Sequence, residues 1–253
     1  MIIYIIMNKE TLLKYISDNL STREIAKYEG VTQSKVKYWI KKYEIKTKYS
    51  AFGKGISPKR EKQEFNIEDI AIKKDRVYNY LYGLYLGDGC LYKRKDRNVS
   101  TITFSLDKKY PNIIKQCESY LHDLFGKFPY IYHRKNSNSV DVKYTSIIVD
   151  KLFLKYGSGK KHMNGIYLPK ILVDNIHYDC LLKGLFHSDG SYYFNNRSGT
   201  YCYSFTNKSI DILNIFSRCL NFYDVKHSLS KDHIMIQSNK EVKKLYKILE
   251  QKN

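Results

Sequence analysis

Two aspartates in a repeated sequence are the residues whose type and spacing most clearly point to chemistry. Asp88 and Asp189 each end a segment with the pattern L-x-G-L-x-x-(G/S)-D-G, and the segments begin at Leu81 and Leu182, 101 residues apart. One such Asp-Gly pair is explained equally well by a turn that ends a helix. Two copies in matching context weaken that explanation, because a turn does not require the preceding residues to repeat.

The small residues in both segments predict how the two aspartates are brought together. Gly83 and Gly87 are four residues apart and therefore share one face of a helix, as do Gly184 and Ser188. Small residues on one face let two helix backbones approach closely. We therefore expect these four residues to form a helix interface, with the two carboxylates meeting at its carboxyl-terminal end.

Such a carboxylate pair predicts a metal site. The two charges repel each other, and both lie at the negative end of a helix dipole. A divalent cation, Mg²⁺ or Mn²⁺, would relieve this repulsion. Hard cations that bridge carboxylates and phosphate oxygens are the usual means of hydrolysing a phosphodiester bond. Asp88 and Asp189 are therefore predicted to be catalytic metal ligands.

The charge of the chain indicates the kind of partner. The sequence holds 44 Lys and Arg against 25 Asp and Glu, a formal net charge of +19. Such an excess is typical of proteins that bind a polyanion, either nucleic acid or an anionic membrane surface. No apolar run has the length of a membrane-spanning helix, and the basic residues are spread along the chain. We therefore expect a nucleic-acid partner and no membrane.

The five cysteines form no CxxC pair and show no disulfide-like spacing. This fits a reducing, intracellular compartment. We expect the cytoplasm or nucleoid of a bacterium or phage host, or an organelle.

The elements around the two motifs also repeat. Each motif helix is followed by two strands, a helix, two further strands and a closing helix. The helices are expected at 112–125, 146–156, 210–222 and 239–250, and the later strands at 128–134, 139–144, 225–229 and 233–237. The fold class is therefore predicted to be α+β, with two pseudo-symmetric αββαββα halves in residues 66–253, divided into about 70–170 and 171–253.

The amino-terminal residues predict a separate small all-α module. Residues 8–45 show short helical periodicity, and the Lys-, Gly- and Ser-rich stretch 46–65 is predicted to be a basic linker. Residues 22–36 resemble a helix-turn-helix, in which Ser21 and Glu24 can form a capping box and Thr32 can cap the second helix. A purely structural helical hairpin is the alternative. The DNA-contacting face of the second helix would comprise Gln33, Ser34, Lys35, Lys37, Tyr38 and Lys41.

The paired motifs and the pattern that follows them resemble the LAGLIDADG homing endonuclease family over about residues 70–250. The resemblance implies that the motif helices join the two halves, that two antiparallel sheets form a saddle in the DNA major groove, and that Asp88 and Asp189 bind Mg²⁺. The backbone carbonyls of Gly87 and Ser188 would be auxiliary ligands. The first Asp of the family's name is replaced by Leu86 and His187, at a position that varies in the family.

The resemblance also implies a basic residue near each scissile phosphate. Lys208 fits the usual position at a strand end in the second half. The matching offset in the first half falls on Asp107, with Lys108 one residue later. Lys161 is a further catalytic candidate. A lysine that merely contacts phosphate is the alternative for each.

The DNA-contacting residues of the sheets are expected to alternate along the strands. Arg and Asn in such positions read guanine and adenine edges. The alternative is that half of these residues face the helices beneath the sheet. In the first half the candidates are Tyr92, Arg94, Thr101, Thr103, Arg134 and Lys143, and in the second half Tyr193, Asn195, Tyr201, Tyr203 and Ser228.

These observations predict a sequence-specific, Mg²⁺-dependent double-strand DNA endonuclease of the homing type. Both halves lie on one chain, so a monomer that binds double-stranded DNA is expected. The alternatives are an RNA maturase, which would bind intron RNA and assist group I intron splicing, and a non-cleaving DNA-binding transcription regulator. Intact acids in both motifs favour cleavage over the regulator.

Overall fold

The computed structural model describes residues 7–18, 20–45, 71–93, 98–156 and 165–249. The chain divides into two compact units, residues 1–64 and 65–253. The described part of each unit has its own hydrophobic core. The linker expected at 46–65 lies outside the described residues.

The first unit contains three short helices. The capping box is present as predicted, since Ser21 accepts from the backbone of Glu24 and the Glu24 side chain accepts from the backbone of Ser21. Thr32 caps the third helix through Lys35 N, which is also as predicted. Gly30 has a φ of 62° and allows the turn between the second and third helices. The helices are α1 (Lys9–Ser17), α2 (Thr22–Tyr28) and α3 (Gln33–Lys42).

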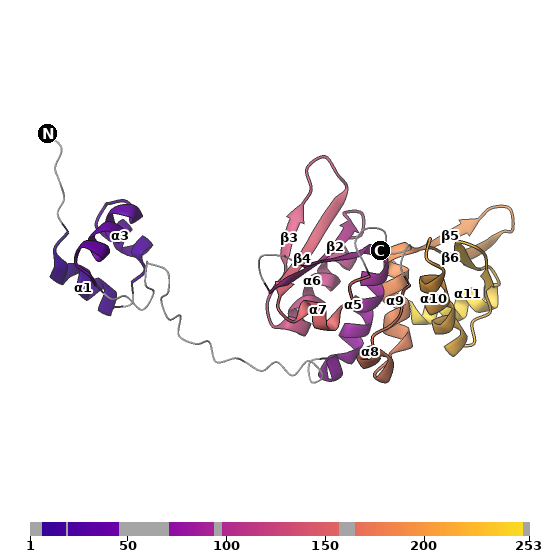
Figure 1. The fold of residues 1–253 in the computed structure, drawn as a ribbon. Helices are drawn as coiled ribbons and strands as arrows, with labels where there is room; N and C mark the ends of the chain where they lie inside the picture. Colours follow the sequence, from indigo (N-terminus) through magenta and orange to yellow (C-terminus); the bar gives the residue numbers. More distant parts are fainter. Residues whose placement is uncertain (1–6, 19, 46–70, 94–97, 157–164, 250–253) are drawn as a thin grey trace. The chain divides into compact units, whose positions relative to one another are not determined.

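The second unit consists of two halves with the predicted order of elements (Figure 1). The first half contains α5 (Asp75–Asp88), β1 (Gly89–Lys93), β2 (Ser100–Asp107), α6 (Pro111–Phe125), β3 (Tyr130–His133), β4 (Ser139–Ser146) and α7 (Val149–Leu152). A short helix, α8 (Lys170–Asp174), precedes the second half. The second half contains α9 (Tyr178–Asp189), β5 (Gly190–Asn195), β6 (Thr200–Thr206), α10 (Ile210–Phe222), β7 (Ser228–Leu229), β8 (His233–Ile236) and α11 (Asn239–Ile248).

Each half carries a four-stranded antiparallel sheet. The strand orders are β1-β2-β4-β3 and β5-β6-β8-β7, so the two sheets have the same topology. They also have the same register, because Gly89 pairs with Phe104 in the first sheet and Gly190 pairs with Phe205 in the second. The predicted α+β fold of two pseudo-symmetric halves is therefore confirmed.

The boundaries differ from the prediction at the end of the first half. The closing helix was expected at 146–156, but α7 spans only Val149–Leu152. The reason is that β4 continues through Ser146, which pairs with Ser100 of β2. A backbone that is committed to the strand ladder cannot also begin the helix.

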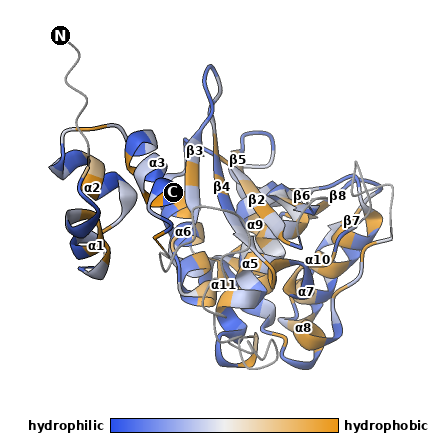
Figure 2. Ribbon diagram, turned by 60° about the vertical axis from the view of Figure 1, so that its left-hand side comes forward, coloured by the Kyte–Doolittle hydropathy of each residue, from blue (hydrophilic) through white to orange (hydrophobic). Residues whose placement is uncertain are grey.

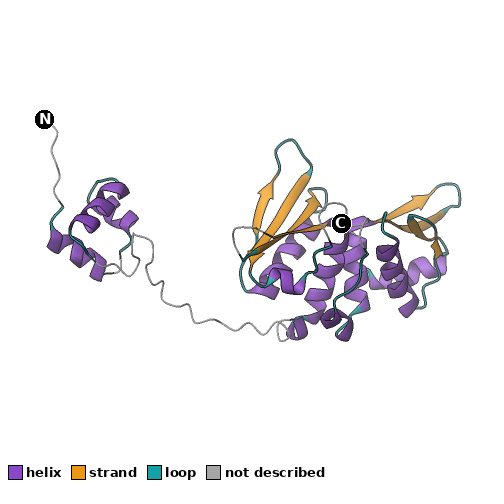
Figure 3. Cartoon of the chain, in the orientation of Figure 1, coloured by secondary structure: helices purple, strands orange, loops and turns teal. Residues whose placement is uncertain are grey.

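The helices of the second unit cover one side of the sheets (Figure 3). Its core joins both halves, with fully buried Phe104 and Phe205 contributed by the sheets and Leu84 and Leu185 by the motif helices. Figure 2 shows apolar residues concentrated on α5, α9 and α10. The opposite sheet faces are the ones left for contact with a partner. No helix in the described ranges has the length and hydropathy needed to span a membrane.

Candidate active site

The two motif helices, α5 and α9, lie side by side and touch through their backbones (Figure 1). A Cβ on Gly83 would lie 2.3 Å from the carbonyl oxygen of Leu181, and a Cβ on Gly184 would lie 2.1 Å from the carbonyl oxygen of Tyr80. No side chain fits at such distances. The glycines therefore allow the two helices to approach this closely.

A polar cluster joins the amino-terminal ends of the same helices. Asn79 is fully buried, and its amide group donates to the carbonyl of Asn175 at 2.9 Å and accepts from the backbone of His177 at 3.1 Å. The His177 ring also contacts Asp75 at 2.7 Å, and Arg76 pairs with Asp179. Because Asn79 bonds backbone atoms of the segment that leads into α9, it sets the position of one helix along the other.

The carboxyl-terminal ends of the pair bring the two aspartates to one place. A Cβ on Gly87 would lie 2.3 Å from Cβ of Ser188 and 2.7 Å from Oδ2 of Asp189. The Asp189 carboxylate therefore lies against the last turn of α5, and Asp88 is the next residue of that turn. Two acidic side chains and two helix carboxyl termini concentrate negative potential at this end of the pair.

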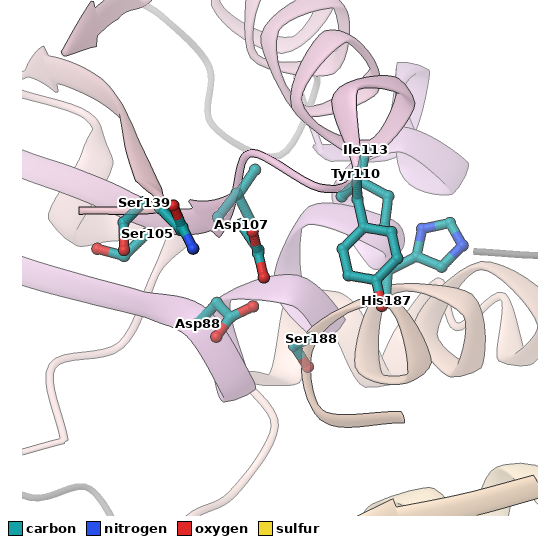
Figure 4. A pocket seen from close by; sticks show the side chains of 10 residues that line it. Asp88, Ser105, Asp107, Tyr110, Ile113, Ser139, His187 and Ser188 are labelled. Atoms are coloured by element: carbon teal, nitrogen blue, oxygen red, sulfur yellow. The ribbon is translucent and has the colours of Figure 1, made fainter. Parts of the chain in front are cut away.

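A cavity of about 280 Å³ opens at this end, and Asp88 and Ser188 both line it. Figure 4 shows Asp107, at the end of β2, directing its carboxylate toward Asp88. Ser105 and Ser139 add polar groups from the neighbouring strands. The cavity is thus acidic and lined by oxygen atoms, which suits a hard cation.

Asn207 is a site residue that the sequence did not reveal. Its amide nitrogen donates to Oδ2 of Asp189 at 2.9 Å, and its Oδ1 accepts from the backbone of Ser209 at 2.8 Å. The second bond fixes the amide, so that Asn207 holds one oxygen of Asp189 in a defined orientation. At the matching position the first half has buried Leu106. The only sequence signal was the position of Asn207 at a strand end, beside Lys208.

The donor set fits Mg²⁺ or Mn²⁺ better than a metal held by protein side chains alone. In the described part of the chain no three His, Cys, Asp or Glu side chains gather as a metal site. Structural zinc sites require about four such ligands. Magnesium commonly uses one or two carboxylates and takes its other ligands from water and substrate phosphates. Asp88 and Asp189, with the carbonyls of Gly87 and Ser188 nearby, can supply the protein share.

Of the candidate lysines that the structure describes, neither Lys108 nor Lys208 lines the cavity beside Asp88. The ammonium of Lys108 donates to the carbonyl of Ser137 at 2.7 Å, at the turn between β3 and β4, and Lys108 does not line the cavity. Lys208 is exposed in the segment after β6. Lys161 lies outside the described residues. Their proposed catalytic roles therefore stay predictions.

The strand register places most of the first-half candidates on the exposed face of their sheet. Tyr92 pairs with Thr101, and Thr103 pairs with Lys143, on the face opposite buried Ile102. Arg134 follows β3 and reaches Ser105 on this face. Arg94 lies outside the described residues.

Two tyrosines expected on the DNA-contacting face of the second sheet lie on the opposite face. Tyr203 is only 2% exposed and lies against Phe186, so it belongs to the core. Tyr201 shares its face, because the two flank Cys202 along β6, and it borders a cavity of about 360 Å³ beside α11. The face opposite Tyr203 instead carries Tyr193, Asn195, Ser228 and Met235, together with Cys202, which is fully buried there.

The third helix of the first unit separates into a buried and an exposed face. Val36, Trp39 and Ile40 are buried against α1 and α2. Gln33 donates to Thr22 at 2.9 Å, which ties the start of α3 to α2. Lys35 is half-buried, and the exposed members of the predicted DNA-contacting face are Ser34, Lys37, Tyr38 and Lys41.

The fold and the site together define a protein of two αββαββα halves, with an acidic cavity where its two motif helices end. Residues 75–158 match the family described as LAGLIDADG-like domain. The resemblance seen in the sequence is therefore confirmed. The match covers most of the first half, and the second half repeats the topology and the motif of the first.

Several solved structures are similar to this chain. Variants of the homing endonuclease I-DmoI show 18% identity and a TM-score of 0.45, over 71% of this chain and 98% of theirs. The homing endonuclease I-WcaI bound to its DNA recognition sequence shows 19% identity and a TM-score of 0.48, over 70% and 81%. The N-terminal LAGLIDADG domain of DUF199/WhiA shows 14% identity and a TM-score of 0.44, over 73% and 88%. A comparison with curated proteins gave no match.

Proposed function

We propose that the chain is a site-specific double-strand DNA endonuclease of the homing type, dependent on Mg²⁺ or Mn²⁺. The observation that carries the proposal is the meeting of Asp88 and Asp189 at one end of a backbone-to-backbone helix pair within a LAGLIDADG-like fold. The net charge of +19 supports a polyanionic substrate. The two exposed sheet faces supply a surface on both sides of the helix pair.

In this mechanism the protein holds the cation and positions the DNA. A bound Mg²⁺ would supply positive charge that polarises the scissile phosphate and lowers the pKa of an attacking water. Asp88 and Asp189 would hold the cation, and Asn207 orients Asp189 through its bond to Oδ2. The rigid contact at Gly83 and Gly184 keeps the two aspartates in register for the two strands.

Two single substitutions test this proposal. The full-length protein, with Mg²⁺, is incubated with DNA that spans the gene's own insertion site restored to its uninterrupted form. Asp88→Asn and Asp189→Asn are each expected to lower cleavage by about a hundredfold or more, while binding to the same duplex persists. Asp123→Asn removes one exposed carboxylate of α6 and is the matched control.

The outcomes separate the rival functions. Cleavage that survives both substitutions would refute the metal-ligand assignment. Duplex binding without cutting by the unmodified protein would favour a DNA-binding regulator. Absence of cutting together with tight, specific binding of intron RNA would favour a maturase.

We further propose that residues 8–45 form a helix-turn-helix module that adds DNA contacts beyond the two sheets. The supporting observations are the capped helices α2 and α3, the turn at Gly30 and the exposed basic face of α3. Positively charged side chains on a recognition helix suit the major groove and its flanking phosphates.

A further inference from the structure

A buried carboxylate lies at the centre of an ionic network on the otherwise exposed face of the first sheet. Asp141 is only 3% exposed, and it pairs with Ser105 and Tyr132 across the sheet. Nη2 of Arg134 lies 2.8 Å from its Oδ1, and Nζ of Lys143 lies 3.1 Å from its Oδ2. The Ser105 hydroxyl donates to Oδ1 at 2.9 Å. Each carboxylate oxygen therefore holds one cation.

The network fixes both cations before any ligand arrives. Arg134 also donates to the Ser105 hydroxyl at 3.1 Å, and the Lys143 ammonium lies 4.9 Å from the centre of the Tyr132 ring. Long basic side chains normally lose rotamer freedom when they bind. Here that freedom is already reduced, while the two side chains remain 46% and 34% exposed.

An acid at this place is unfavourable for simple attraction to DNA. Its negative charge lowers the positive potential that draws phosphates to the sheet. A surface meant only to hold phosphates would gain by leaving it out. Orientation is the property that Asp141 adds, and orientation matters for base recognition more than for phosphate contact.

The geometry points to the reading of a guanine. An arginine binds guanine through two parallel N–H bonds to O6 and N7, which requires a guanidinium held in a defined plane. The bonds of Arg134 to Asp141 and Ser105 both use Nη2, at one corner of the guanidinium group. We infer that Arg134, oriented by Asp141, reads a guanine in the DNA half-site that the first sheet contacts. The inference rests on the proposed DNA-binding function and specifies one base of the DNA sequence that the protein recognises.

The second sheet provides an internal comparison. Ser105 pairs with Asp141 in the first sheet, and the matching pair in the second is Thr206 with His233. Thr103 pairs with Lys143, and the match is Ser204 with Met235. A carboxylate flanked by two cations is replaced there by an imidazole and a thioether. The inference therefore assigns the oriented arginine, and the guanine it reads, to the half-site of the first sheet alone.

The test is selection of bound duplexes from a random-sequence library by the full-length protein in EDTA, so that no strand is cut. Cys90 lies on the exposed face of β1, and a cross-link from its thiol to DNA identifies the half-site beneath the first sheet. We expect one guanine to be required in that half-site. Arg134→Lys keeps the charge and should lower the preference for that guanine about tenfold or more.

Asp141→Asn separates orientation from charge. It should lower the preference for the same guanine while affinity for unrelated duplexes stays equal or rises, because a negative charge leaves the surface. Asp123→Asn makes the same change of charge on α6, where the side chain is exposed, and should leave the base preference unchanged. Thermal unfolding of each variant shows whether it is folded.

Three results would overturn the inference. The half-site cross-linked to Cys90 could lack a required guanine, the folded Arg134→Lys protein could keep the preference in full, or the protein could bind no duplex at all. The last result would also remove the proposed function. Selective duplex binding without cutting when Mg²⁺ is supplied would contradict the endonuclease alone and leave this inference standing.

Discussion

Asn207 gives Asp189 a different environment from Asp88. It donates to Oδ2 of Asp189, whereas Leu106 occupies the matching position beside Asp88. Asp107 adds a further carboxylate on the Asp88 side of the site. Because each aspartate is expected to serve one DNA strand, the two strand cuts are expected to respond differently to changes at these residues.

Replacing Asn207 by the leucine of the first half tests this inequality. Asn207→Leu removes the donor that orients Asp189, and partners of metal ligands typically contribute ten- to a hundredfold to activity. We expect cleavage of one strand to slow by roughly this factor, so that nicked DNA accumulates. Strand-specific labels on the duplex measure the two rates, and Asn221→Leu on the exposed side of α10 is the control. Equal slowing of both strands would contradict the assignment.

The pH dependence of stability should report the Asp141 network. Burial opposes ionisation of Asp141, but hydrogen bonds from Arg134, Ser105 and Lys143 outweigh it and hold the pKa of the carboxyl below its usual 3.8. A carboxyl with a lowered folded-state pKa stabilises the fold above its unfolded-state pKa. That contribution is lost as the pH falls through the lowered value.

Asp141→Asn should therefore destabilise the protein by about 2 kcal/mol near neutral pH, as expected for hydrogen bonds to a charged group. The difference from the unmodified protein should shrink as the pH falls below about 4. Urea unfolding at a series of pH values measures it. A difference that stays constant into strong acid would show that the ionised carboxylate is not the stabilising form.

At the scale of elements, the helix pair is the part on which both halves depend. Gly184→Ala places a Cβ about 2.1 Å from the Tyr80 carbonyl, so α5 and α9 must separate. Overpacking of this kind costs about 1–3 kcal/mol. We expect that loss of stability in urea, and a larger loss of cleavage than of duplex binding, because the aspartates move with the helices. Gly165→Ala meets no atom within 4 Å and is the matched control. Unchanged stability would contradict the close backbone contact.

The elements also show which features the sequence could predict. The repeat predicted the order of elements in each half, because a motif that recurs in matching context constrains both copies. The repeat also predicts which face of a strand is exposed, because a residue and its counterpart 101 positions later are expected on the same face. Thr101 and Thr103 were placed correctly, and the same offset of 101 leads to Cys202 and Ser204. Ser204 and the fully buried Cys202 lie on the corresponding face of β6, and the neighbouring tyrosines lie on the opposite face.

Other features of the site could not be predicted from the sequence repeat. Asn207 and Asp107 approach the motif aspartates only because β2 and β6 end beside the helix pair. A lone asparagine or aspartate carries no periodic signal, and its role depends on contacts distant in sequence. The hydrogen bonds of Asn79 with Asn175 and His177 likewise join residues that are distant in sequence, so no local pattern predicts them.

At the scale of the whole molecule, charge is divided between the two units. Residues 1–64 contain 14 Lys and Arg and 7 Asp and Glu, a net of +7, which leaves +12 of the total of +19 for residues 65–253. Both units are therefore expected to contribute phosphate contacts. Since each contact releases counterions, the salt dependence of binding counts them.

Replacing three lysines of α3 tests the part played by the first unit. The full-length variant Lys35→Gln, Lys37→Gln, Lys41→Gln should bind the target more weakly, with a slope of log affinity against log salt that is shallower by up to about 2.7. Its matched control, Lys9→Gln, Lys14→Gln, Lys27→Gln, removes the same charge from α1 and α2. If α3 faces the DNA, the control should change the slope by much less, because only direct phosphate neutralisation releases counterions. Equal changes in the two variants would show that the first unit acts through its overall charge, and an unchanged slope in both would show that it does not touch the duplex.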